Sequence, residues 1–305
     1  MRTEFKRVGV LMGGPSAERE VSLETGQGVL AALRSLGYDC VELDWTDQAS
    51  VCELVSRVDV VWNALHGTFG EDGAIQGLLS CLRVPYTGSG ILASALAMDK
   101  VASKRIFEAR GVPTPPWRVL QDDTNPDDIA LPAVIKPAQE GSSVGVSIVQ
   151  AREQVAPAIA QARNFHGATL IEEFIPGAEV QTGILDGEVL GSIEIRPAVE
   201  FYDYEAKYQR DDTQYLIPTT LTPDVLTRAE KVALEAYFAL GCAGHSRIDL
   251  RVRGDGEVFC LEVNTLPGMT GHSLLPKIAA HRGMDYAELC DRILSSASRS
   301  RRLWL

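Results

Sequence analysis

The chain has 305 residues, of which 45% are hydrophobic and 23% are charged, which is typical of a folded globular protein with two or three domains. Its net charge of −12 argues against nucleic acid or an anionic membrane surface as the main partner, because both need a basic footprint. No stretch has the length of a signal peptide core or of the ~18 apolar residues that span a membrane. We therefore expect a cytoplasmic protein with neither nucleic acid nor membrane as a partner. The six cysteines show no metal-binding or Cys-x-x-Cys spacing, and we expect reduced thiols.

The first part of the chain predicts a parallel α/β unit. An apolar strand is expected at 7–12, and a GGPS turn leads from it into a helix that ends at Gly37. Further strands are expected at 38–45 and 59–65. This order of strand, turn, helix and strand is the start of a parallel α/β unit. We expect an N-terminal α/β domain over residues 1–95.

Two further segments, 96–180 and 181–305, are each predicted to mix helices and strands. The first has a helix from about Asp99 to Arg110, a strand ending at Lys136 and a strand at 168–175. The second contains strands at 181–196, an irregular stretch at 201–218, a helix from Pro223 to Leu240, a hairpin at 246–264 and a tail that we expect to be mostly solvated. We expect each segment to form a domain.

The hairpin places acidic and amide side chains in an apolar run. Asp255-Gly256 is a strong two-residue turn signal, and a loop of these two residues sets Asp249 opposite Glu262 and Arg247 opposite Asn264. Strict alternation leaves the other face entirely apolar. Its predicted members are Ile248, Leu250, Val252, Phe259, Leu261 and Val263, whereas Cys260 falls on the polar face.

Opposed carboxylates only ~4.5–5.5 Å apart at Cβ destabilise a strand pair unless something positive lies between them. One interpretation is that Arg247 and Arg251 neutralise Asp249 and Glu262 on a solvated face. The other is a hard-cation site, because carboxylate and amide oxygens are the ligands that Mg²⁺ takes, usually beside substrate phosphates. The hairpin alone leaves both open.

Elsewhere the sequence offers candidate phosphate contacts. Lys136 precedes a Gly/Ser loop, EGSSVGV at 140–146, whose N–H and hydroxyl groups suit an anion, although such loops are also ordinary tight turns. Lys100 lies in the first turn of its helix, where the macrodipole disfavours a cation by roughly 0.3–1 kcal/mol. A bound anion would offset that cost, and so would simple solvation. Glu18 follows the GGPS turn and either favours the helix dipole or binds an ammonium group.

Taken together, these pieces resemble the D-alanine–D-alanine ligases of the ATP-grasp family along almost the whole chain. The similar motifs are GGPSAEREVSL (13–23), ALHGTFGEDG (64–73), PYTGSGILASALAMDK (85–100), IKPAQEGSSVGVS (135–147), FYDYEAKY (201–208), SRIDL (246–250) and EVNTLPGMTGHSLLP (262–276). The resemblance implies a three-domain ATP-grasp architecture of α/β and α+β segments with a Rossmann-like N-terminal domain. It further implies that ATP lies between the central and C-terminal domains, and that the protein is a homodimer.

The resemblance implies nucleotide and metal contacts. On the ATP side these are Lys100, Lys136 and Ser143 at the phosphates, and Glu172 and Glu179 at the adenine and ribose. Asp249, Glu262 and Asn264 are similar to the ligands of two Mg²⁺ ions, for which Mn²⁺ is a possible substitute. Glu173 and Gln181 depart from the usual residues at their positions.

The resemblance also implies a reaction in which two D-alanine molecules are joined through an acyl phosphate. Glu18 and His66 would meet the first substrate, and Lys207, Ser273 and Leu274 the carboxylate of the second. Arg247 and the backbone N–H of Gly268 would stabilise the tetrahedral intermediate. Ser142, Tyr208 and Glu18 would form a hydrogen-bonded lock over the site.

Four alternatives remain. A D-alanine–D-lactate ligase is disfavoured because the EAKY motif with Lys207 and Tyr208 is intact. Another ATP-grasp carboxylate–amine ligase is disfavoured because Glu18, Lys207 and Ser273 together suit a small α-amino acid pair. A non-catalytic nucleotide-binding protein would not need Arg247 together with Asp249, Glu262 and Asn264. An NAD-dependent dehydrogenase lacks support, because no G-x-G-x-x-G follows the first strand.

Overall fold

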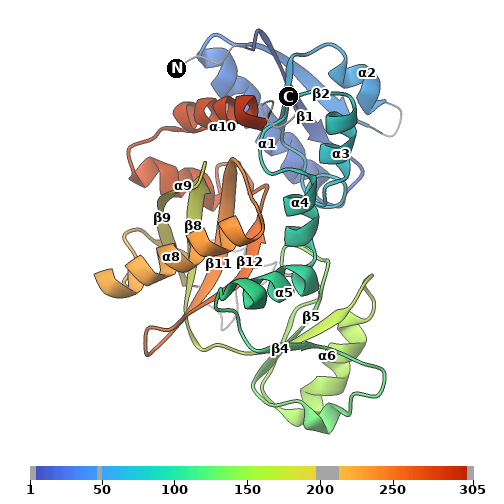
Figure 1. Cartoon of the computed structure of the whole chain (residues 1–305), viewed down its shortest axis with the longest axis vertical. Helices are drawn as coiled ribbons and strands as arrows, with labels where there is room; N and C mark the ends of the chain where they lie inside the picture. The colour runs from blue at the N-terminus through green and yellow to red at the C-terminus, as the bar shows by residue number, and fades with distance from the viewer. Residues whose placement is uncertain (1–4, 47–49, 197–212, 301–305) are drawn as a thin grey trace.

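The computed structural model describes residues 5–46, 50–196 and 213–300. Its sheets lie in three successive parts of the chain, and Figure 1 shows them arranged along the long axis of the molecule. The expected lid residues Lys207 and Tyr208 lie outside the described residues. In the described part, no helix is long and apolar enough to cross a membrane. All six cysteines are free thiols, as predicted.

The N-terminal sheet is parallel, with strand order β2-β1-β3. Its strands β1 (Arg7–Gly13) and β3 (Val60–Asn63) are almost fully buried, which is typical of a parallel sheet covered on both faces. The other elements of this part are β2 (Asp39–Trp45), α1 (Arg19–Ser35), α2 (Val51–Val55), α3 (Ala74–Cys81) and α4 (Ile91–Met98). This confirms the predicted strand, turn, helix and strand order.

The central sheet has four antiparallel strands in the order β4-β7-β5-β6. Its elements are β4 (Trp117–Val119), β5 (Ala133–Pro137), β6 (Ser147–Val149), β7 (Thr169–Glu173), α6 (Val155–Ala162) and two short 3-10 helices, η1 (Pro126–Asp128) and η2 (Arg152–Gln154). Helix α6 packs its apolar face on this sheet, where Ile159 and Ala162 join Ile135 and Val149 in one core cluster. The sheet therefore carries Lys136 on β5 next to Glu172 on β7.

The third sheet is antiparallel, with strand order β10-β9-β8-β11-β12. Its strands are β8 (Gly177–Leu185), β9 (Glu188–Arg196), β10 (Gln214–Leu216), β11 (His245–Arg253) and β12 (Val258–Asn264). Helix α8 (Pro223–Ala239) covers one face (Figure 1), with Thr222 at its N-cap and Gly241 in a left-handed conformation just past its end, as predicted. The predicted domain boundaries stay a prediction. Strand β8 begins at Gly177 and therefore runs across the predicted boundary between residues 180 and 181.

Helices α9 (Leu274–His281) and α10 (Tyr286–Ser300) return the end of the chain to the N-terminal sheet (Figure 1). Leu289 and Ile293 of α10 share a core cluster with Val29 and Leu33 of α1. The tail that was predicted to be mostly solvated comprises residues 296–305. That prediction is wrong for its first two residues, Ser296 and Ala297, which are buried. The amphipathic period of this helix outweighs its polar composition.

Helix α5 (Lys100–Arg110) connects the N-terminal and central parts of the chain. Asp99 caps it, because its carboxylate accepts hydrogen bonds from the backbone N–H groups of Val101 and Ala102. Such a cap contributes about 0.5–2 kcal/mol. It also fixes where the helix begins, and hence where the side chain of Lys100 points.

The hairpin of β11 and β12 has the predicted pairs, Asp249 with Glu262 and Arg247 with Asn264. Its details differ, since Arg253 pairs with Glu257 around a loop of residues 254–256. That loop shifts the register by one residue, and an irregularity after Asp249 shifts it back.

The face assignment of β12 before Glu262 is therefore wrong, whereas Leu250 and Val252 of β11 lie in the core as predicted. Cys260, predicted on the polar face, pairs with Leu250 and is fully buried in the core. Leu261, predicted on the apolar core face, instead lines the pocket beside Glu262. A one-residue slip sends each side chain to the opposite face.

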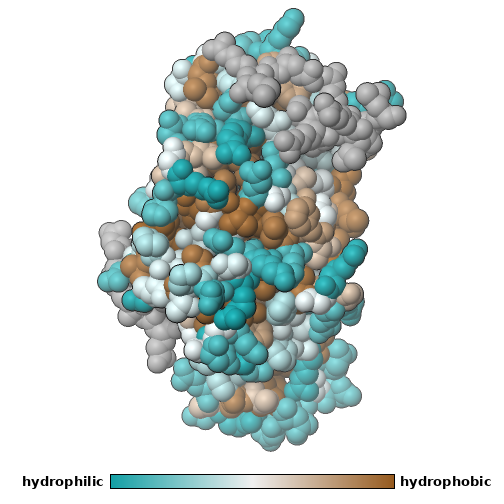
Figure 2. Space-filling model, turned by 60° about the vertical axis from the view of Figure 1, so that its left-hand side comes forward, coloured by the Kyte–Doolittle hydropathy of each residue, from teal (hydrophilic) through white to brown (hydrophobic). Residues whose placement is uncertain are grey.

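Hydrophobic and hydrophilic surface are unevenly distributed. On the face shown in Figure 2, hydrophobic residues gather in the middle of the molecule, and hydrophilic residues cover most of its lower end. The few large apolar side chains exposed in the described chain include Ile91 and Leu92, in the first turn of α4.

Candidate active site

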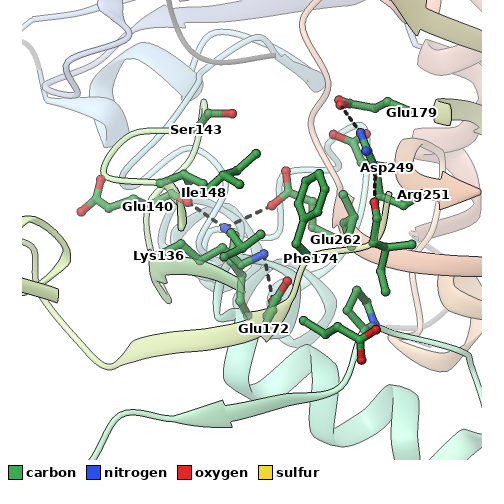
Figure 3. Close-up of a pocket in the computed structure, with 17 residues that line it drawn as sticks. Lys136, Glu140, Ser143, Ile148, Glu172, Phe174, Glu179, Asp249, Arg251 and Glu262 are labelled. Atoms are coloured by element: carbon green, nitrogen blue, oxygen red, sulfur yellow. Dashed lines mark hydrogen bonds and ion pairs between the residues drawn. The ribbon is translucent and has the colours of Figure 1, made fainter. Parts of the chain in front are cut away.

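An open pocket lies between the central sheet and the β11–β12 edge of the third sheet, and Figure 3 shows its lining. The space inside this pocket, including the part that is open to solvent, is about 840 Å³. Predicted site residues from six elements and the Gly/Ser loop converge here, although they are far apart in sequence. They are Lys100, Lys136, Ser143, Glu172, Glu179, Asp249 and Glu262.

Two lysines, one from α5 and one from β5, reach the pocket. Lys100 donates from Nζ to the carbonyl oxygen of Glu140, 2.7 Å away, and its Nζ lies 3.2 Å from Oε2 of Glu262. Lys136 places its Nζ 2.9 Å from Oε1 of Glu172 (Figure 3). Both lysines are 7% exposed, so each holds a cation in a poorly solvated position. Burying a charge in this way requires a nearby counter-charge.

Glu172 is the buried acceptor of this cluster, with an exposure of 2%. Burial raises the pKa of its carboxyl, but the ammonium groups of Lys104 and Lys136 outweigh that effect and the net shift is downward. Glu172 is therefore ionised. Its predicted contact with adenine stays a prediction.

Lys104 is a part of the site that the sequence reading missed. Its Nζ lies 3.1 Å from Oε1 of Glu172, and its side chain is fully buried. The sequence does contain a hint of its burial, because Lys104 lies one helical turn after Lys100 on a helix face that also buries Val101 and Phe107. A lysine on a buried helix face needs a partner, and none could be assigned before Glu172 was placed.

The opposed carboxylates of the hairpin are each compensated by a different cation. Arg247 binds Asp249 in a bidentate pair, with Nε–Oδ1 and Nη2–Oδ2 distances of 2.8 and 2.9 Å. The expectation that Arg251 neutralises one of these two carboxylates was wrong. Arg251 pairs with Glu179 at 3.3 Å and Glu262 pairs with Lys100, so Arg247 confirms half of that interpretation.

The acidic edge also suits a divalent cation. Asp249 and Glu262 are directly opposed, and Asn264 follows Glu262 on the same side of β12. In the described chain no three His, Cys, Asp or Glu residues form a metal cluster. A set of two carboxylates and one amide is nevertheless all oxygen, which is the donor chemistry of Mg²⁺. Such a set leaves coordination positions for other oxygen ligands.

The Gly/Ser loop is held in an uncommon backbone conformation. Ser142 and Ser143 have φ of 51° and 60°, a left-handed region that costs a non-glycine residue roughly 1–2 kcal/mol. Ser142 Oγ donates to Oε1 of Glu18 over 2.6 Å, which joins the loop to the N-terminal domain. Glu18 itself stands at the N-cap of α1. Two of the three predicted lock residues are thus in contact.

His66 and Glu18 lie near one another in the N-terminal part. Ser16 donates from Oγ to the carbonyl oxygen of His66 over 2.6 Å, and a Cβ on Gly67 would stand 2.7 Å from Oε2 of Glu18. The ring Nε2 of His66 is 3.0 Å from Oγ1 of Thr25. These contacts fix His66 in place and explain why position 67, with φ of 69°, is glycine.

The segment after β12 brings three predicted residues together. A Cβ on Gly268 would lie 2.8 Å from Oγ of Ser273, so glycine permits this close approach. Ser273 is the N-cap of α9, and its Oγ accepts a hydrogen bond from the N–H of Thr270. Leu274 is the first residue of that helix, whose N-terminal N–H groups favour an anion.

Two family models cover much of this architecture. Residues 106–295 match the model described as "D-ala D-ala ligase C-terminus", and residues 46–89 match "D-ala D-ala ligase N-terminus". The chain belongs to the D-alanine–D-alanine ligase family. This confirms the family and enzyme class that the sequence motifs predicted.

Curated members of the family are similar over nearly their whole length. The D-alanine–D-alanine ligase of Geobacter sulfurreducens is 48% identical, with coverage of 97% of this chain and 96% of the relative. That of Anaeromyxobacter sp. strain Fw109-5 is also 48% identical, over 96% of this chain and 97% of the relative.

Solved structures agree with the fold. The D-alanine–D-alanine ligase of Bacillus anthracis has a TM-score of 0.89 at 39% identity, covering 98% of this chain and 99% of the other. Another structure of that ligase, complexed with ATP, has a TM-score of 0.87 at 35% identity and covers 98% and 100%. The predicted ATP-grasp fold of α/β and α+β segments is confirmed.

Proposed function

We propose that the protein joins two D-alanine molecules into D-alanyl-D-alanine and converts ATP to ADP and phosphate, a reaction that supplies peptidoglycan precursors. The observation that carries this proposal is the convergence of Lys100, Lys136, Asp249 and Glu262 on one pocket. Family membership and the ATP complex of a similar ligase support the choice of nucleotide.

In the first step the carboxylate of one D-alanine attacks the γ-phosphate of ATP, which gives ADP and an acyl phosphate. An anion that attacks a polyanion needs neutralisation and fixed geometry more than covalent help. Lys100 and Lys136 supply fixed positive charge, and the backbone N–H groups around Ser143 suit phosphate oxygens.

Asp249, Glu262 and Asn264 would hold divalent metal. We propose two Mg²⁺ ions, with Mn²⁺ as a possible substitute, and when bound they neutralise phosphate charge. On metal binding, the carboxylate of Glu262 would exchange its ion pair with Lys100 for the metal. The ammonium of Lys100 would then be available to the nucleotide.

In the second step the amine of the second D-alanine attacks the acyl carbonyl, and phosphate leaves. Negative charge develops on the carbonyl oxygen, where the guanidinium of Arg247 and the N–H of Gly268 would donate hydrogen bonds. One such donor typically contributes about 10²–10³ in rate. The bidentate pair with Asp249 holds Arg247 in a fixed orientation.

Substrate selection is assigned to groups on both sides of the pocket. Glu18 would bind the first ammonium group, with His66 beside it. Lys207, Ser273 and the N–H of Leu274 would bind the second carboxylate. Tyr208 would complete the lock whose Ser142–Glu18 contact is already formed, and the closed site would keep water from the acyl phosphate.

The experiment that tests the proposal is an ADP-release assay with D-alanine, L-alanine or D-lactate as the acceptor. We expect turnover to require ATP, Mg²⁺ and D-alanine. Equal turnover with L-alanine, or none with D-alanine, contradicts the proposal. Ester formation with D-lactate would favour the D-alanine–D-lactate alternative.

We also propose that the protein is a cytoplasmic homodimer. The cytoplasmic assignment is supported by the free thiols of Cys52 and Cys81, both exposed. The dimer is supported by Ile91 and Leu92, which are 44% and 70% exposed at the start of α4, because adjacent exposed apolar side chains favour a subunit interface.

A further inference from the structure

Lys104 is a fully buried charge that the proposed mechanism does not use. It lies on α5 one turn after Lys100, yet it does not line the pocket. With an exposure of 0%, its ammonium cannot reach a ligand. Its position therefore has to be explained through the residues that it contacts.

Two ammonium groups share a single carboxylate oxygen. Nζ of Lys136 and Nζ of Lys104 lie 2.9 and 3.1 Å from the same Oε1 of Glu172. Lys136 also lines the pocket, as Figure 3 shows, whereas Lys104 lies on α5 and does not line it. Glu172 is thus bound from the pocket side and from the protein interior at once.

Thr114 completes the surroundings of Lys104. Its Oγ1 lies 2.6 Å from the Nζ of Lys104, and the same hydroxyl donates to the carbonyl oxygen of Cys260 over 2.8 Å. Because the hydroxyl of Thr114 donates its proton to the carbonyl oxygen of Cys260, its oxygen accepts a hydrogen bond from the ammonium of Lys104. Lys104 is therefore held as a donor between β7 and β12, the strands that carry Glu172 and Glu262.

The charge balance of this cluster depends on Lys104. Lys136 and Glu172 alone form a neutral pair, with no net positive charge for an anionic ligand. Lys104 brings the cluster to a net charge of +1. Lys104 does not line the pocket, so Lys136 is the ammonium group of this cluster that a ligand in the pocket would contact.

Stability alone does not explain a lysine here. Replacing buried charges by apolar side chains of similar volume is often neutral or stabilising. Val101, three residues before Lys104 on α5, belongs to an apolar cluster with Ala138 and Leu170. A charge retained at this position thus points to a role in binding.

We infer that Lys104 is a positioning residue that supplies the counter-charge of Glu172 and so leaves the charge of Lys136 available to the nucleotide phosphates. The inference rests on the proposed function, since ATP is the anionic ligand. It assigns Lys104 no contact with substrate.

The test compares ATP and adenosine binding to the wild type and to Lys104→Met, with adenosine measured by competition. We expect ATP affinity to fall at least about tenfold, which corresponds to ~1.4 kcal/mol, while adenosine affinity stays within about twofold. Adenosine lacks the phosphates that Lys136 would meet. Equal losses for both ligands, or no loss for ATP, would overturn the inference.

The double variant Lys104→Met/Glu172→Gln separates counter-charge from general structure. It restores the net charge of +1 on Lys136 alone. Because Glu172 is also the predicted adenine contact, the quantity compared is the ratio of ATP affinity to adenosine affinity, and we expect this ratio to be higher than in Lys104→Met. A ratio equal to or below that of Lys104→Met would overturn the inference. Because the double variant removes both the buried ammonium of Lys104 and the buried carboxylate of Glu172, it stays informative even if Lys104→Met folds poorly.

Lys231→Met is the matched control, because Lys231 is an exposed lysine of α8 whose side chain is 73% accessible. We expect its ATP affinity to equal that of the wild type. A wild type that binds no ATP would overturn the proposed function itself. A wild type and a Lys104→Met variant that bind ATP equally would overturn the inference alone.

Discussion

Asp249 and Glu262 face one another across β11 and β12, yet their carboxylates are compensated by cations from different elements. Arg247 on the same strand holds Asp249, and Lys100 at the start of α5 holds Glu262. Each of the two opposed carboxylates thus has its own counter-charge. The arrangement lets either carboxylate exchange its cation for a divalent ion.

Neutralising either carboxylate separates its roles in catalysis and stability. We expect Asp249→Asn and Glu262→Gln each to lower kcat by at least about 10²-fold, comparable to the loss of one electrostatic donor in an active site. The ADP-release assay with varied Mg²⁺ measures this. A rise in the Mg²⁺ concentration needed for half-maximal rate would support a metal role.

Asp249→Asn should also lower the stability of the protein when metal is removed. Asp249→Asn leaves the mostly buried guanidinium of Arg247 without its counter-charge, and we expect a loss of about 1–3 kcal/mol by denaturant unfolding. We expect this loss although the substitution also removes one of the two opposed charges. Asp123→Asn, at an exposed turn position, is the control and should be neutral. An Asp249→Asn variant as stable as the control would show that the pair with Arg247 is weak.

The contact of Ser142 with Glu18 can be tested separately from the backbone of the Gly/Ser loop. Ser142→Ala removes the hydroxyl and keeps the cost of positive φ, whereas Ser142→Gly removes both. We expect both variants to lower kcat/KM for D-alanine about tenfold or more, because each loses a hydrogen bond to a charged group worth about 1.5–3 kcal/mol. If Gly restored full activity, backbone strain and not the hydroxyl would matter. Ser147→Ala, just beyond the loop, is the control.

The hairpin shows how local sequence signals can give the right contact for an incomplete reason. A two-residue turn at Asp255-Gly256 was expected to pair Asp249 with Glu262. The structure has a longer loop and a compensating irregularity, so the pair near the site was right. The face of Cys260, between the two shifts, was wrong. Alternation predicts a face only while the register is unbroken.

Contacts between distant segments set the limit of the sequence reading. The sequence identified six of the nine charged residues that line the pocket, and the patterns predicted the main strands and helices near their observed positions. Lys104 was missed because its partner Glu172 lies on β7, far away in the sequence. The burial of Ala297 escaped for a similar reason, since α10 packs on α1 at the other end of the chain. Such pairings depend on tertiary packing.

The proposed dimer can be tested at α4. We expect Leu92→Glu to convert a dimer to a monomer in sedimentation velocity, because a carboxylate would be buried without a partner at the interface. Phe238→Glu is the control, because Phe238 is similarly exposed, at 60%, but lies at the end of α8. A monomeric wild type, or a Leu92→Glu variant that remains a dimer, contradicts this assignment.

His245 makes stability depend on pH. It is fully buried next to the ring of Trp62, 5.8 Å away, and neither of its ring nitrogens has a hydrogen-bond partner among the described residues. Burial, together with the nearby His66, lowers the pKa of His245 from 6.5 to about 4. The folded state therefore favours the neutral ring.

The sign follows from proton linkage. Between pH 6.5 and about 4 the unfolded chain binds a proton at His245 that the folded chain does not, so stability falls as pH falls, by up to about 1.4 kcal/mol per unit. Above pH 6.5 this residue contributes no pH dependence. Denaturant unfolding of the wild type and His245→Leu from pH 7 to pH 4 measures the difference, and the variant should lose less stability. His166→Gln, at an exposed position, should follow the wild type, and parallel curves for all three would show that His245 does not titrate on unfolding.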